Sequence, residues 1–195
     1  MKKLLTIVMF AAVALLSSSF SDQGRWIIDP QSKLSIHGAT NVNTFKCMLG
    51  AYNMHDTLEY VRDKASIEMN LTRNRMRIPV RNFDCGNKQI TKDFWSTLKS
   101  ERYPELEISF RSFRRNDISD KSYVDGVVDI TLAGATKRYT VRYFARTPDN
   151  ETLLLTGTQE VNFSDFKLEP PQKMMGLIQV QECLNVEFNL MLRSL

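Results

Sequence analysis

The feature that most constrains this fold is a repeat of two residues in its apolar positions. In residues 105–110, with the sequence ELEISF, apolar and polar side chains alternate without interruption, and residues 66–71, 128–132 and 184–190 show the same alternation. Successive side chains of a β-strand point to opposite faces, so this pattern predicts strands with one apolar and one solvated face. Antiparallel sheets commonly have such faces, whereas parallel sheets are usually covered on both sides. The sequence therefore predicts an all-β antiparallel domain.

Length and turn signals limit how these strands are arranged. The chain has 195 residues, which suits one domain, and it shows no long helical pattern. Turn-forming pairs separate the strand candidates at residues 29–30, 133–134 and 149–150. About eight or more short strands in succession favour a barrel or a sandwich. We expect one β domain over residues 22–195.

Residues 1–21 have a separate explanation. Lys2 and Lys3 precede an apolar run over residues 4–16, and small serines follow, which is typical of a secretory signal peptide. The alternative is a membrane anchor, but a spanning helix needs about 20 apolar residues and this run is shorter. No later segment of the sequence is long and apolar enough to span a bilayer. We expect a periplasmic or secreted mature protein without a transmembrane segment.

The charge argues against a nucleic-acid partner. The formal net charge is +4, and removal of Lys2 and Lys3 with the signal peptide leaves +2. Domains that bind nucleic acid are usually strongly basic on one face. We therefore expect no nucleic-acid partner.

Three cysteines cannot all pair within one chain, but an exported protein permits disulfides. Cys47 and Cys85 both lie at the ends of strand candidates, and we predict a disulfide between them. Cys183 lies in the middle of a strand candidate, where we expect a buried or half-buried thiol.

One short helix interrupts the strand pattern at residues 91–100. Thr91 is a plausible N-cap, Phe94 and Leu98 fall on one face with Trp95 beside them, and residues 103–104, Tyr-Pro, end the helix. A helix of two to three turns does not persist alone in water, so it must pack on an apolar surface. We expect it to cover the mouth or flank of a barrel as a plug or lid.

Catalytic and metal-binding motifs are not evident. His37 and His55 are the two histidines, and the sequence has neither zinc-ligand spacing, nor a G-x-S-x-G motif, nor a phosphate loop. Cys47 with either histidine is the alternative catalytic pair. We expect a protein that is not an enzyme and has no metal site.

Several motifs, in this order, resemble those of the YceI-like family. They are WIIDPQSKLSIHGATNVNTFKC at residues 26–47, DFW at 93–95, YPELEISF at 103–110, the segment from Gly126 through Val141, and VNFSDFKL at 161–168. The resemblance covers most of residues 25–192. In the last motif, Ser164 and Lys167 stand where the family has Arg and Gly, so this chain resembles a divergent member.

The resemblance implies an elongated antiparallel lipocalin-like β-barrel of about eight strands. It also implies export, no catalytic residues, no cofactor, and a long isoprenoid or quinone-type lipid bound inside the barrel.

Side-chain alternation and the helix together predict the residues that contact such a lipid, all of them apolar or aromatic. They are Ile67, Met69, Phe94, Trp95, Leu98, Leu106, Ile108, Phe110, Val128, Ile130, Leu132, Tyr139, Val141, Tyr143, Val186, Phe188 and Leu190.

The alternative is a packed core, because the same residues would also fill a barrel. Such a protein would act as an extracytoplasmic protein-interaction or stress-related module. Residues 168–179, LEPPQKMMGLIQ, are relevant to this alternative, because the methionines of this loop can contact a partner. We expect this loop to fold back over the barrel.

Overall fold

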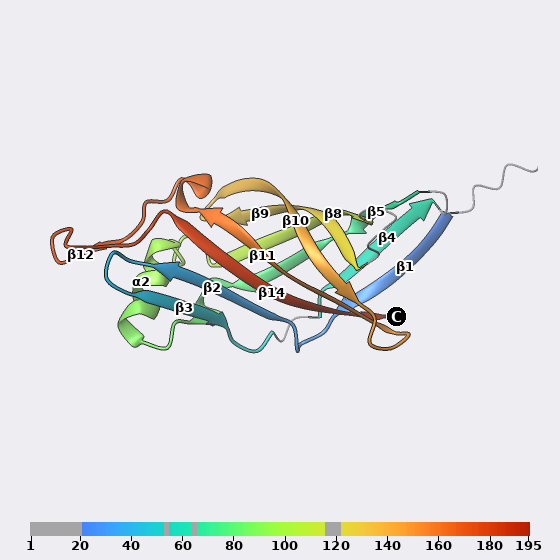
Figure 1. The fold of residues 1–195 in the computed structure, drawn as a ribbon, viewed down its shortest axis with the longest axis horizontal. Coiled ribbons are helices and arrows are strands. Elements are labelled where there is room, and N and C mark those ends of the chain that lie inside the picture. Colours follow the sequence, from blue (N-terminus) through green and yellow to red (C-terminus); the bar gives the residue numbers. More distant parts are fainter. Residues whose placement is uncertain (1–20, 53–54, 64–65, 116–121) are drawn as a thin grey trace, which may run out of the picture.

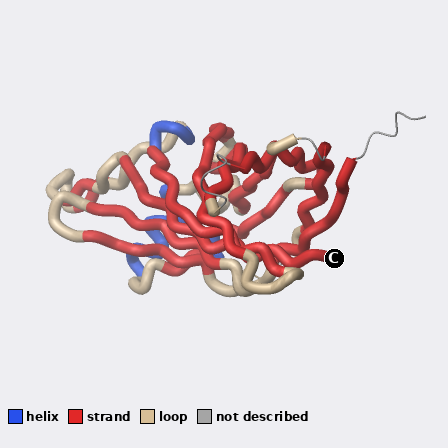
Figure 2. Tube along the Cα trace, turned by 45° about the vertical axis from the view of Figure 1, so that its right-hand side comes forward, coloured by secondary structure: helices blue, strands red, loops and turns tan. Residues whose placement is uncertain are grey.

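The computed structural model describes residues 21–52, 55–63, 66–115 and 122–195. The predicted signal peptide lies outside the described residues except for Ser21, and its removal stays a prediction. Figure 2 shows that strands form most of the described chain. The strands are β1 (Ser21–Ile28), β2 (Lys33–Ala39), β3 (Thr44–Leu49), β4 (Thr57–Asp63), β5 (Glu68–Arg73), β6 (Arg75–Pro79), β7 (Phe83–Asp84), β8 (Glu105–Arg115), β9 (Tyr123–Leu132), β10 (Ala135–Arg146), β11 (Thr152–Asn162), β12 (Gln172–Lys173), β13 (Ile178–Gln179) and β14 (Cys183–Ser194). The helical segments are η1 (Val80–Asn82), α2 (Lys88–Thr97) and η2 (Phe163–Phe166).

Eight of these strands close into a ring. The order is β1-β4-β5-β8-β9-β10-β11-β14, and β14 then pairs with β1, with Ile28 opposite Leu192. All of these pairings are antiparallel. The ring is drawn out along one axis (Figure 1). The predicted antiparallel lipocalin-like barrel is therefore confirmed.

The barrel wall divides at one end. After a break at residues 29–32, β2 pairs with β14 where β1 has left it, and β3 and β7 continue the sheet outward from β2. On the opposite side, β6 follows β5 along the edge of β8. The helix α2 lies beside β2 and β3 at this end of the barrel (Figure 1).

The helix begins and ends three residues earlier than the sequence predicts. Asn87 is the N-cap, and its side chain accepts hydrogen bonds from the backbone N–H groups of residues 89 and 90. The predicted N-cap, Thr91, is buried within the first turn, where its hydroxyl accepts from the Cys85 N–H and donates to Asp84. Leu98 is the C-cap, and residues 99–104 form a turn before β8.

The predicted disulfide between Cys47 and Cys85 is confirmed. It joins β3 to the segment that enters α2, so it fixes the start of the helix against the barrel wall. A disulfide fits an oxidising compartment. The expectation for Cys183 is wrong, because this thiol lies at the first residue of β14 and is exposed.

The turn after β11 contains the predicted motif residues Asp165 and Lys167. The Asp165 carboxylate in η2 forms an ion pair with the Lys137 ammonium at 2.9 Å and accepts a hydrogen bond from the Tyr139 hydroxyl at 2.8 Å. Both contacts hold the pKa of Asp165 below its usual range. Lys167 follows with a φ of 55°, in the left-handed region that favours glycine. Lys167 thus has a backbone conformation that residues other than glycine adopt infrequently.

An ion-pair ladder crosses the outer face of β8, β9 and β10. The Asp129 carboxylate on β9 is 10% exposed and accepts from Arg138 at 2.6 Å and from Arg111 at 2.8 Å. Hydrogen bonds to Arg138 and then Arg111 outweigh desolvation and lower the pKa of Asp129 to about 2. The ladder therefore stabilises this strand order when Asp129 is ionised.

We expect Asp129→Asn to lower the free energy of unfolding by about 1–2 kcal/mol at pH 7, because both arginines remain partly solvated. The folded-state pKa lies below the ordinary value of 3.8, so the contribution is present above pH 4 and is lost as the pH falls toward 2. Urea unfolding of both proteins at pH 7, 3 and 2 checks this. A stability difference that stays constant down to pH 2 would contradict it.

Candidate functional site

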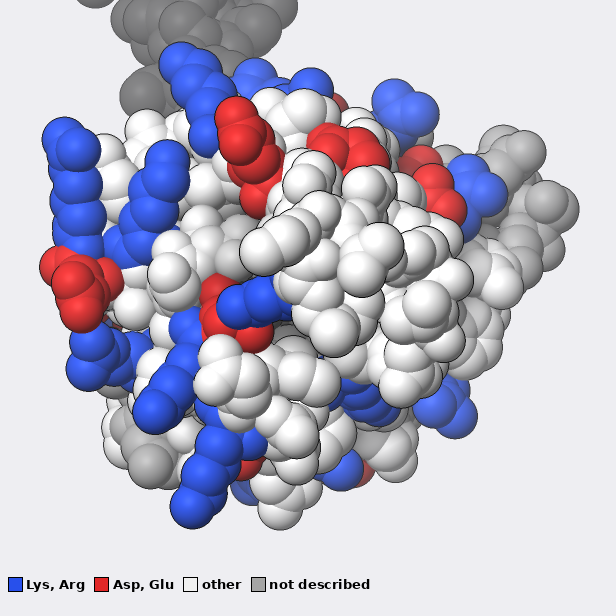
Figure 3. Space-filling model, turned by 90° about the vertical axis from the view of Figure 1, so that its left-hand side faces the viewer, with Lys and Arg blue, Asp and Glu red and all other residues white. Residues whose placement is uncertain are grey.

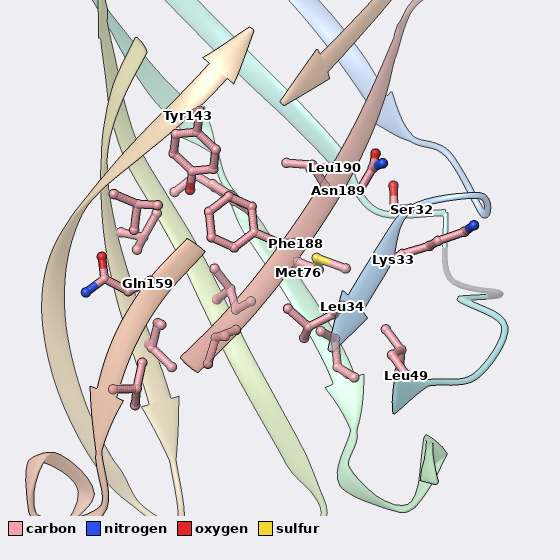
Figure 4. Close-up of a pocket in the computed structure, with 18 residues that line it drawn as sticks. Ser32, Lys33, Leu34, Leu49, Met76, Tyr143, Gln159, Phe188, Asn189 and Leu190 are labelled. Atoms are coloured by element: carbon pink, nitrogen blue, oxygen red, sulfur yellow. The ribbon is translucent and has the colours of Figure 1, made fainter. Parts of the chain in front are cut away.

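The barrel interior contains a narrow apolar cavity of about 80 Å³. Its walls come from β2, β3, β6, β8, β9, β10, β11 and β14, and Figure 4 shows their side chains converging from opposite sides. The lining residues are Ser32, Lys33, Leu34, Leu49, Met76, Ile78, Ile108, Phe110, Val128, Ile130, Val141, Tyr143, Gln159, Val161, Val186, Phe188, Asn189 and Leu190. Nine of the residues predicted from alternation are among them.

Aromatic side chains take up much of the space in this interior. The rings of Tyr143 and Phe188 lie 5.0 Å apart, and Phe113 packs against the edge of Tyr143 at 5.9 Å. A cavity of roughly 150 Å³ holds one benzene molecule, so about 80 Å³ accommodates only a small group. Half of the 18 lining residues were predicted from the sequence, but the interior does not leave room for the slender lipid chain expected there.

A larger apolar groove of about 500 Å³ lies at the end of the barrel that carries α2. This volume falls within the roughly 300–1,000 Å³ of ordinary ligand pockets. The groove is formed by the β2–β3 turn, α2, and the segment around β12 and β13. Its lining residues are Thr40, Val42, Asn43, Thr44, Phe45, Gln89, Ile90, Asp93, Phe94, Thr97, Leu98, Phe163, Pro171, Lys173, Ile178, Val180 and Leu184.

Three long-range contacts hold the groove walls together. The Asn41 side chain donates to the Leu177 carbonyl at 2.9 Å and accepts from the Gln179 N–H at 3.0 Å, which joins the β2–β3 turn to β13. Lys173 forms an ion pair with Asp93 at 2.8 Å, which joins β12 to α2. Local sequence patterns do not reveal such contacts.

The groove and the interior cavity follow one another along the same inward faces. On β14, Leu184 lines the groove and Val186, two residues later, lines the cavity. At the end of β11, Val161 lines the cavity and Phe163 lines the groove. Residues two apart on a strand share a face, so the groove continues the barrel axis.

A third, more polar hollow of about 580 Å³ opens beside the break between β1 and β2. It shares Ser32, Lys33, Leu34, Leu49, Phe188 and Asn189 with the interior cavity. Lys46 and Glu187 add charged groups to its wall. The interior is thus bordered by an apolar groove at one end and a polar hollow at the side.

The remaining predicted lining residues lie elsewhere. Ile67 precedes β5 and is 65% exposed, so its predicted inward position is wrong. Trp95 donates from its indole N–H to the Phe83 carbonyl at 3.1 Å and faces an outer hollow beside Arg81, while Phe94 and Leu98 line the groove. Four further predicted residues line neither the cavity nor the groove. They are Met69, Leu106, Leu132 and Tyr139, and the hydroxyl of Tyr139 donates a hydrogen bond to Asp165.

Some lining residues were missed although the sequence held a signal for them. Leu184 continues the alternation of β14 by one step, and Met76 and Ile78 alternate within β6. The five-residue length of β6 and its terminal Pro79 made that strand a weak candidate.

The catalytic alternative does not fit this structure. The sulfur of Cys47 is bonded to Cys85, so Cys47 offers no thiol to either histidine. His37 instead contacts Glu187 and Ser35 on the barrel surface, each at 3.1 Å. Among the described residues, no three His, Cys, Asp or Glu side chains form a group that could hold a metal ion. Every helix in the described ranges is too short or too polar to cross a bilayer.

The β12–β13 hairpin projects from the α2 end of the barrel, rather than folding back over it as predicted (Figure 1). Its tip exposes Met174, Met175 and Leu177. The surface at this end shows an uncharged area with charged side chains around it (Figure 3).

The fold and the site together define an antiparallel β-barrel with an apolar interior and a helix-bordered apolar groove. Comparison with protein-family models and with curated protein sequences gives no match. Solved structures do match. BcnA of Burkholderia cenocepacia has a TM-score of 0.60 at 16% identity, over 84% of this chain and 98% of that chain.

A polyisoprenoid-binding domain from Saccharophagus degradans, implicated in plant cell wall breakdown, has a TM-score of 0.59 at 12% identity, over 89% of this chain and the whole of that one. A YceI protein of Campylobacter jejuni matches at a TM-score of 0.46 and 14% identity, over 89% of this chain and 85% of that one, and we base no argument on it. The first two matches show that this chain shares its fold with these proteins, which agrees with the fold that the resemblance to the YceI-like family implies.

Proposed function

We propose that this protein binds the hydrocarbon chain of a long amphiphilic lipid, of isoprenoid or quinone type, without catalysing a reaction on it. The observation that carries the proposal is the apolar groove of about 500 Å³ that continues the barrel axis beside α2. The fold shared with a polyisoprenoid-binding domain supports it. The predicted export and the disulfide support a role outside the cytoplasm.

The chemistry of the groove suits a hydrocarbon chain. Its charged side chains, Asp93 and Lys173, neutralise each other, so the remaining wall is largely apolar. Each CH₂ group moved from water into such a surface contributes about 0.8 kcal/mol. A chain of several isoprene units can therefore bind without specific polar contacts.

The helix α2 forms one wall of the site in this proposal. Phe94 and Leu98 project from it toward the groove, and the disulfide holds its first turn in place. Binding along the axis beyond the groove requires Phe188 and its neighbours to move, because the cavity of about 80 Å³ is too small for a chain. The groove is therefore the primary site.

Extraction of the protein with organic solvent after purification from its native cells tests the proposal. We expect mass spectrometry to show a lipid near one equivalent per chain, or, after delipidation, saturable uptake of added geranylgeraniol. Absence of both would contradict the proposal. The Cys183→Ala variant, whose substitution lies on the exposed surface, is expected to match the wild type and serves as a handling control.

The second candidate function is that of a protein-interaction module with a packed core. The filled interior and the exposed tip of the β12–β13 hairpin favour it. Changing Met174, Met175 and Leu177 together to serine separates the two candidates. Lipid uptake stays unchanged if the groove is the site, whereas an interaction module would lose its partner.

A further inference from the structure

Tyr143 brings a hydroxyl group into the apolar interior. The residue lies on β10, is 4% exposed, and packs against Phe188 and Phe113. Figure 4 shows its hydroxyl turned toward the other side chains that line the cavity. Within the described part of the chain, no protein group forms a hydrogen bond with this hydroxyl, and burial raises the pKa of the phenol.

Two other tyrosine hydroxyls, one buried and one half-buried, have carboxylate partners within the protein. Tyr52 donates to Asp56 at 2.6 Å, and Tyr139 donates to Asp165 at 2.8 Å. A hydroxyl without a protein partner in an apolar wall is unfavourable, and phenylalanine would fill the same space without this cost. The hydroxyl at this position therefore points to a partner outside the chain.

We propose that the Tyr143 hydroxyl is a specificity-determining donor, which binds a hydroxyl or carbonyl oxygen at the buried end of the lipid. The inference rests on the proposed function. Phe188, which packs on Tyr143, lies four residues along β14 from Leu184 in the groove, roughly 13 Å. A lipid that displaces Phe188 and reaches from the groove along the axis thus brings its leading end to Tyr143. The cavity of about 80 Å³ suits a small oxygen-bearing group there.

Paired ligands and the Tyr143→Phe variant test this inference. The probes are geranylgeraniol and the hydrocarbon of the same carbon skeleton that lacks the hydroxyl. We expect the wild type to bind the alcohol about tenfold more tightly than the hydrocarbon, and the variant to bind both equally, with its hydrocarbon affinity unchanged. The variant is expected to melt at or above the wild-type temperature, because it loses no hydrogen bond within the protein.

Tyr139→Phe is the matched control. It removes the hydroxyl that bonds to Asp165 outside the cavity, so it should lower stability and keep the tenfold preference. Equal wild-type affinities for the two probes, or a preference that survives in Tyr143→Phe, would overturn the inference while leaving lipid binding intact. If the wild type binds neither probe, the proposed function is contradicted, and the inference, which rests on it, is contradicted as well.

Discussion

Replacing Cys47 and Cys85 together by alanine is expected to lower the free energy of unfolding by about 4 kcal/mol. The disulfide closes a loop with a sequence separation of 38 residues, and cross-linking such a loop reduces the conformational entropy of the unfolded chain by that amount in the chain-entropy model. For a chain of this size, the melting temperature should fall by about 10 °C. Thermal and guanidinium unfolding of the oxidised wild type and the double variant measure both quantities.

Cys183→Ala provides the control for this experiment. Its thiol is exposed and forms no disulfide, so the variant should stay within about 0.5 kcal/mol of the wild type. Addition of a reductant should bring the wild type to the stability of the double variant. A double variant within about 1 kcal/mol of the oxidised wild type would mean that the disulfide does not constrain the unfolded chain as expected.

Filling the groove is expected to weaken lipid binding by about 10- to 100-fold. Ile90 lies on α2 at the edge of the groove and is 38% exposed, so Ile90→Trp places an indole ring where the lipid chain would lie. Exclusion of two to three carbons at about 0.8 kcal/mol each falls within this range. Titration of the delipidated proteins with geranylgeraniol measures it.

The matched control for this prediction is Ser96→Trp. Ser96 is exposed on the same helix but faces an outer hollow rather than the groove, so the same ring is added without blocking the site. Both variants should melt close to the wild type, because neither position is buried. Equal affinities of the two variants would show that the groove is not the binding site.

The barrel could be predicted from the sequence because its signal is local. Alternation places Val128 and Ile130 on the inward face of β9 regardless of which strands flank it. The same signal gave a wrong prediction at Ile67, because the alternating pattern begins in an exposed segment before the first residue of β5. The helix was predicted three residues too late because Asn87 and Thr91 are both residue types that favour the N-cap position. In the structure the Thr91 hydroxyl forms hydrogen bonds with Asp84 and Cys85 instead.

The groove could not be predicted, because its walls meet only in the folded chain. Asn41 contacts Gln179 across 138 residues, and Lys173 contacts Asp93 across 80. The width of the interior also could not be predicted from the sequence. Alternation identifies Tyr143 and Phe188 as inward-facing, but whether their rings leave a channel depends on packing to within an ångström or so.

Photocrosslinking tests the central claim most directly. A geranylgeraniol analogue with a diazirine near its chain end is bound to the delipidated protein, and the complex is irradiated. Peptide mass spectrometry then identifies the peptides to which the analogue is crosslinked. The account predicts labelling of peptides that contain Ile90, Phe94 or Val180, which unlabelled geranylgeraniol abolishes. Labelling that is absent, or that is spread over the outer surface and resists competition, would contradict the claim that this groove binds a lipid chain.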